Sequence, residues 1–81
     1  MSMQTFYVIQ PYVKQGRKIA QGNAFEVANE GQALRRIEHM ISGSTVGVIA
    51  IAREHDPEAQ EFGETRVIGY RGEVPPEALE E

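Results

Sequence analysis

The hydrophobic positions of this chain change their spacing from one segment to the next. Residues 5–13 and 18–28 are rich in β-branched and aromatic side chains, which favour extended strands. Pro11 cannot donate to a sheet ladder, so we expect it at an edge or a bulge. Gly22 and Asn23 are expected to divide the second segment into two pieces. Residues 14–17 are expected to form a turn, since Gly16 tolerates a positive φ.

A helix is expected over residues 30–42. Its apolar residues recur at helical spacing and form one stripe, which comprises Ala33, Leu34, Ile37, Met40 and Ile41. Asn29 suits the N-cap, and Gln32 stands three residues later, where it is able to complete a capping box. Gly43 suits the left-handed position just past the end of a helix.

Two further strands are expected over residues 45–53 and 64–71, joined by a turn at residues 56–59 and paired as a hairpin. Both faces of the first of these strands are apolar. Its even positions carry the small residues Val46, Val48, Ala50 and Ala52, which would let a helix pack closely. Ile49 and Ile51 would then point to the other side.

The element order is therefore β-β-α-β-β. It predicts an α+β fold, in which one helix packs on one face of a four-stranded antiparallel sheet. We expect residues 1–74 to form a single domain. Pro75 and Pro76 are expected to end regular structure, so that residues 75–81 form an acidic, flexible tail.

A single helix covers only one face of such a sheet, and the second face is apolar as well. A large exposed apolar patch is unusual on a soluble monomer, so we predict a homodimer whose candidate interface residues are Tyr7, Ile9, Ile49 and Ile51. The alternative is that the chain's own segment 14–28 folds back over this face.

Composition narrows the class of protein. The 81 residues are 41% hydrophobic and 25% charged, which is typical of a soluble globular chain, and the absence of Cys excludes disulfides, Cys-ligated zinc and thiol catalysis. The longest apolar run, residues 46–52, is too short to span a bilayer, and no signal peptide is recognisable. We therefore expect a cytoplasmic protein that has no membrane contact.

The net charge of −4 is distributed unevenly, as +2 over residues 1–45 and −6 over residues 46–81. Such asymmetry can guide head-to-tail association or steer a charged partner. Two basic groups form a candidate polar surface: one around the first turn and one on the helix, with the members Lys14, Arg17, Lys18, Arg35, Arg36 and His39.

No motif indicates a cofactor, a metal ion or a catalytic mechanism. The acidic residues that follow His55 lack the spacing of an EF-hand and indicate a solvated hairpin tip. A weak nucleic-acid-binding module built on the first hairpin is disfavoured by the low pI of about 5.1. An enzyme whose site is assembled across a dimer interface is the other alternative. Its candidate residues are His39, His55, Tyr70 and Arg71.

Several segments look familiar together: FYVIQ at 6–10, GQALRRIE at 31–38, GVIA at 47–50, DPE at 56–58 and GEVP at 72–75. They resemble a group of short, uncharacterised bacterial proteins of about this length. The resemblance implies no activity, so it assigns no functional residue. We expect a small non-catalytic module that self-associates, or that docks an unidentified protein through an edge strand or the polar face of its helix.

Overall fold

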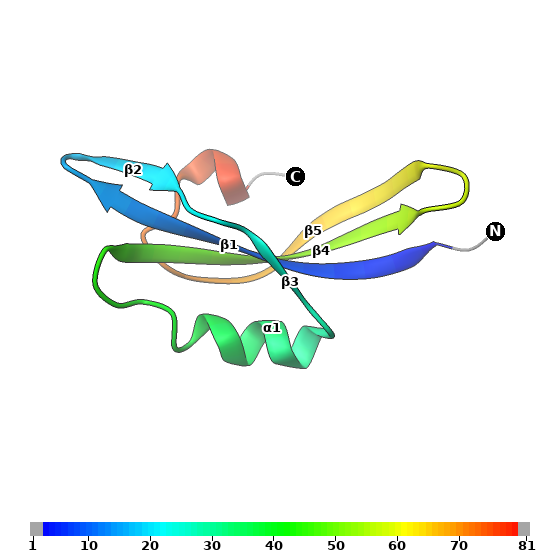
Figure 1. The fold of residues 1–81 in the computed structure, drawn as a ribbon, viewed down its shortest axis with the longest axis horizontal. Helices are drawn as coiled ribbons and strands as arrows, with labels where there is room; N and C mark the ends of the chain where they lie inside the picture. Colours follow the sequence, from blue (N-terminus) through cyan, green and yellow to red (C-terminus); the bar gives the residue numbers. More distant parts are fainter. Residues whose placement is uncertain (1–2, 80–81) are drawn as a thin grey trace.

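The computed structural model describes residues 3–79, in which one helix lies against an antiparallel sheet (Figure 1). The elements are β1 (Gln4–Gln15), β2 (Lys18–Gln21), β3 (Phe25–Val27), α1 (Glu30–Ile37), β4 (Thr45–Asp56), β5 (Glu61–Gly72) and the short 3-10 helix η1 (Pro76–Leu79). The strand order is β2-β1-β4-β5, and β3 also pairs with β1. The α+β class is confirmed. The sheet has five strands because residues 18–28 form two short strands, as Gly22 and Asn23 predicted.

The break between β2 and β3 lies opposite Pro11. The N–H of Gly22 donates to the carbonyl oxygen of Pro11 at 2.9 Å. The N–H and C=O of one residue in an antiparallel strand point the same way, so the proline's missing N–H also faces this break. β1 is a central strand. It accommodates a proline because the strand beside it is interrupted at this position. Nε2 of Gln10 bridges the gap by donating to the carbonyl oxygen of Gly22 at 2.9 Å.

The start of α1 agrees with the sequence. Oδ1 of Asn29 accepts the N–H of Gln32 at 2.8 Å, which confirms the N-cap. The side chain of Gln32 reaches back as well, but it accepts the N–H of Ala28 and not that of Asn29. The two bonds satisfy one donor of the first helical turn and one just before it.

The expected end of the helix at residue 42 is wrong, because α1 stops at Ile37. The next strand must be reached through a turn at residues 42–45, and that turn is tied to the sheet, since the N–H of Lys14 donates to the carbonyl oxygen of Ser44 at 2.8 Å. Residues 38–41 leave the helix because they have to connect its end to this turn. Gly43 has a φ of +58° and serves the turn, not the helix end.

The hydrophobic core lies between α1 and the sheet. Its fully buried members come from both layers: Ile9, Ala33, Ile37, Val48 and Ala50. The prediction that the small residues of β4 face the helix is thus confirmed for Val48 and Ala50. We call the opposite side of the sheet, away from α1, the second face.

The long strands make the molecule elongated, with extents of 45 × 23 × 18 Å. The β1–β2 turn lies at one end and the β4–β5 turn at the other (Figure 1). Asp56 shapes the second of these turns, since its buried Oδ1 accepts the N–H groups of Glu58 and Ala59 at 3.0 and 3.3 Å. Gln60 follows in a left-handed conformation, with a φ of 56°.

The chain leaves β5 by crossing the start of β4. Gly72 turns it, with a φ of +72°, and the N–H of Glu73 then donates to the carbonyl oxygen of Val46 at 2.8 Å. Within the expected tail, Pro76–Leu79 form the 3-10 helix η1, and residues 80–81 lie outside the described part of the chain. Among residues 3–79, no helix is both long and apolar enough to cross a membrane.

Candidate functional site

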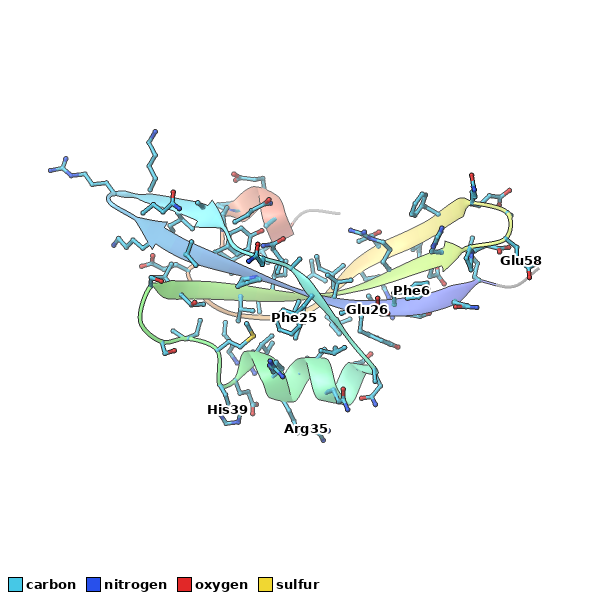
Figure 2. The ribbon with its side chains drawn as sticks, in the orientation of Figure 1. Phe6, Phe25, Glu26, Arg35, His39 and Glu58 are labelled. Carbon is cyan, nitrogen blue, oxygen red and sulfur yellow. The ribbon has the colours of Figure 1, made fainter. Side chains whose placement is uncertain are left out.

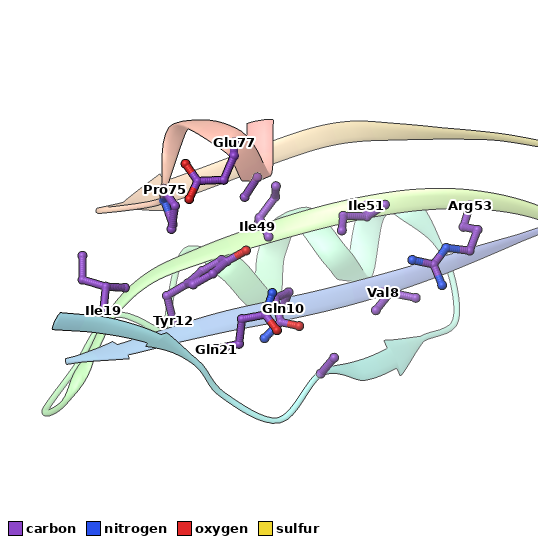
Figure 3. Close-up of a pocket in the computed structure, with 12 residues that line it drawn as sticks. Val8, Gln10, Tyr12, Ile19, Gln21, Ile49, Ile51, Arg53, Pro75 and Glu77 are labelled. Carbon is purple, nitrogen blue, oxygen red and sulfur yellow. The ribbon is translucent and has the colours of Figure 1, made fainter. Parts of the chain in front are cut away.

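The second face holds an open groove of about 570 Å³, which we call the second-face groove (Figure 3). Its floor comes from Val8 and Gln10 of β1 with Ile49 and Ile51 of β4, so three apolar side chains share it with one amide. These residues alternate along their strands with residues that face the helix. One wall is formed by β2 and the residues that follow it, and the other by the chain around η1.

The chain itself covers one part of this groove. Tyr12 is 4% exposed and Ile49 only 1% exposed, and Pro75 and Ala78 line the groove together with them. Val8 and Ile51, farther along the groove, are only half-buried. The second face is therefore closed at the end near η1 and open toward the β4–β5 turn.

Two opposite charges line the groove at different points along its length. Figure 3 shows Glu77 of η1 beside Ile49, and the guanidinium group of Arg53 beyond Ile51. Both side chains are exposed.

The structure separates the four candidate interface residues. Ile49 and Ile51 line the second-face groove, whereas Ile9 is buried beneath α1 and Tyr7 packs against the same core. The cause is the pairing register. It sets Ile9 opposite Ala50, which faces the helix, and residues opposite each other share a face. Val8, the residue between Tyr7 and Ile9, lies on the groove side instead.

Three aromatic rings extend the second face beyond the groove, and no pattern in the sequence grouped them. The rings of His55 and Phe62 stack with centroids 4.5 Å apart, and Phe6 lies 6.0 Å from His55. Phe62 is nevertheless 70% exposed. Figure 2 shows Phe6 on the arm of the sheet that projects beyond the helix. The feature that brings two of these rings together is the β4–β5 pairing, which sets His55 opposite Phe62.

The six basic candidates fall into two groups on different elements. Three residues are exposed around the β1–β2 turn: Lys14, Arg17 and Lys18. The others border a shallow hollow of about 360 Å³ beside the helix, which Val27 of β3 also lines: Arg35, Arg36 and His39. Figure 2 shows Arg35 and His39 pointing away from the sheet. Within the second group, the guanidinium carbon of Arg36 lies 5.0 Å above the ring of Phe25.

The four candidates for an enzyme site do not converge. His39 borders the helix hollow, His55 stacks on Phe62, and Arg71 approaches Glu38 at 3.6 Å in an exposed ion pair. Tyr70 is 50% exposed on β5. In the described part of the chain, no group of three or more His, Asp or Glu side chains is arranged to hold a metal ion.

The chain matches no protein-family model, no curated protein and no solved structure. The resemblance to short bacterial proteins therefore stays a prediction, and function has to be inferred from the surface of the molecule.

Proposed function

We propose that this protein is a small non-catalytic interaction module that self-associates by covering the second face of its sheet with a second copy. The observation that carries the proposal is Phe62, which is 70% exposed. The strand registers set it on the side of the sheet where Val8 and Ile51 line the groove. Exposed apolar side chains that gather on one face mark interaction sites in soluble proteins. The cytoplasmic location expected from the sequence is part of the same proposal.

The alternative that the chain covers this face by itself accounts for only part of the surface. β2 and η1 enclose Ile49, but they leave Ile51 half-buried and Phe62 exposed. The long and short extents of the molecule, 45 and 18 Å, limit the area of this side to at most about 800 Å². The part that the chain leaves open is therefore smaller than the ~800 Å² that each partner buries in a standard interface. A second copy is therefore large enough to cover what remains open.

The energy that Phe62 offers to such an interface is substantial. Burying a phenylalanine side chain is worth about 1.5–3 kcal/mol. A two-fold dimer contains the residue twice, so Phe62→Asp should cost about 3 kcal/mol or more, which is at least a hundredfold in Kd.

Sedimentation velocity at micromolar concentrations tests the proposal. We expect the wild-type chain to sediment at twice its monomer mass of 9.0 kDa, and Phe62→Asp and Ile51→Asp to sediment as monomers. Ile49→Asp is not a clean test, because Ile49 is 1% exposed within one copy and its replacement would destabilise the fold itself.

Ile41→Asp is the matched control, since Ile41 is also an exposed isoleucine, at 43%, but lies outside the groove. This variant should remain a dimer. Circular dichroism should show the wild-type spectrum for all three variants. A wild-type chain that is monomeric at these concentrations would overturn the proposal.

A further inference from the structure

We infer that the two copies pack with their long axes reversed, so that the basic hairpin tip of each copy meets the acidic hairpin tip of the other. The inference rests on the proposed self-association. The basic tip is the exposed group at the β1–β2 turn: Lys14, Arg17 and Lys18. The acidic tip is the exposed group at the β4–β5 turn: Glu58, Glu61 and Glu64.

Two-fold symmetry allows a range of arrangements that pack the second face against itself, and two of them are the limits. The two-fold axis must lie between the two sheets and parallel to them, because only then do the same faces meet. An axis along the strands stacks each hairpin tip on its own copy. An axis across the strands reverses the second molecule and stacks each tip on the opposite one.

Charge distinguishes these two arrangements. The tips lie at opposite ends of a molecule 45 Å long, and Figure 2 shows Glu58 at the β4–β5 end. Because exposed charges are screened over about 8–10 Å at physiological salt, each tip responds to the charge stacked on it and not to the far end. The first arrangement sets three cations against three cations and three carboxylates against three carboxylates, whereas the reversed arrangement opposes unlike charges at both ends.

The charges of these tips are not neutralised within one copy. Among the described residues, the ion pair within 4.0 Å is the one between Arg71 and Glu38, which involves neither tip. The other carboxylate of the β4–β5 turn, Asp56, is buried and occupied in accepting backbone N–H groups. Six exposed side chains therefore remain available to a partner.

The second-face groove shows the same polarity on a smaller scale. Glu77 lies beside Ile49, and Arg53 lies beyond Ile51, toward the β4–β5 turn (Figure 3). Reversing the second copy brings its Arg53 toward Glu77 of the first copy, and its Glu77 toward Arg53. The unreversed arrangement brings two arginines together and two glutamates together. The groove and the tips therefore select the same orientation.

A charge swap tests this orientation. One variant carries Lys14→Glu, Arg17→Glu and Lys18→Glu, and so is acidic at both tips. The other carries Glu58→Lys, Glu61→Lys and Glu64→Lys, and so is basic at both tips. In the reversed dimer each variant repels itself at both ends and attracts the other variant at both ends. We expect each alone to dimerise at least tenfold more weakly than wild type, and an equimolar mixture to form a one-to-one heterodimer by native mass spectrometry.

A control variant distinguishes the position of the changed charges from their effect on the net charge of the molecule. Arg35→Glu together with His39→Glu adds negative charge on the outer side of α1, away from the groove, and should leave the dimer unchanged. If a triple variant does not fold by circular dichroism, the single swaps Arg17→Glu and Glu61→Lys carry the same test with a smaller expected effect.

The outcomes distinguish the two proposals. If wild type is a dimer and both variants self-associate as tightly as wild type, with no preference for each other in the mixture, the reversed orientation is wrong while the proposed self-association stands. If wild type is a monomer, the proposed function itself fails. Self-repulsion of each variant together with recovery in the mixture supports both.

Discussion

Gly47 allows the end of the chain to cross the second face, and replacing it with alanine tests this role. Gly47 is buried in β4. A Cβ atom at this position would overlap the carbonyl oxygen of Glu73 and lie 2.6 Å from the carbonyl carbon. Because these are backbone atoms, no side-chain rotation relieves the overlap. Gly47→Ala must therefore displace the segment that leads into η1.

The cost can be worked from the contacts that this displacement breaks. The hydrogen bond from the N–H of Glu73 to the carbonyl oxygen of Val46, at 2.8 Å, is worth about 1 kcal/mol. Overpacking a close contact costs about 1–3 kcal/mol. We expect the free energy of unfolding to fall by about 2–4 kcal/mol, a large share of the roughly 4–12 kcal/mol typical of a chain of this size.

Urea unfolding followed by circular dichroism measures the change, at one fixed protein concentration because self-association adds to apparent stability. Gly31→Ala is the matched control. Gly31 lies in the first turn of α1, where an added Cβ comes no closer than 3.4 Å, to Oδ1 of Asn29. That variant should be about 0.5–1 kcal/mol more stable than wild type, since alanine is the better helix former.

A shortened chain that ends at Gly72 completes the test. It lacks Glu73, so Gly47→Ala should cost little in that background, and the difference between the two backgrounds gives the coupling energy. The reasoning is refuted if Gly47→Ala changes the stability of the full chain by less than about 0.5 kcal/mol, the level of an ordinary surface substitution. An equal cost in both chains would also refute it.

Two further predictions concern the turns. Gln60 has a φ of 56°, so Gln60→Gly should raise stability by about 1 kcal/mol in thermal unfolding; Gly16→Ala, at a φ of 62°, should lower it, and a change of the same sign in both would contradict this account. Asp56→Ala removes the acceptor of the N–H groups of Glu58 and Ala59 and should cost about 1–2 kcal/mol in urea. Asp56→Asn keeps an acceptor oxygen and should lose less than half of that.

The local signals in the sequence predicted local structure well. Asn29 is the N-cap, Gly22 and Asn23 lie between β2 and β3, and the alternation along β4 assigned Val48 and Ile49 to opposite faces. Each of these features depends on a few neighbouring residues and on the geometry of one element. That is why a single sequence was enough to predict them.

Features that depend on distant partners were missed or misplaced. The apolar stripe predicted a helix to residue 42, but the link between Lys14 and Ser44, 30 positions apart in the sequence, draws the chain out of the helix after Ile37. Pro11 indicated an edge or a bulge. It lies in a central strand, next to the shift in the β1–β4 register between Tyr12 and Val13, and the interruption that accommodates it belongs to another segment. Local propensity does not encode such distant constraints.

The features of the surface also divide into those that the sequence predicted and those that depend on the tertiary structure. By itself, the sequence determined that the chain forms an α+β fold, that one β4 face would remain apolar after the helix had packed on the other, and that the two halves of the chain differ in charge. Only the tertiary structure decided that Val8, and not Tyr7 or Ile9, joins Ile49 and Ile51 on that face, because a strand register shifted by one residue exchanges its faces. It also decided that the residues after β5 cover part of the face, since this requires the backbone of Glu73 to pass directly over Gly47.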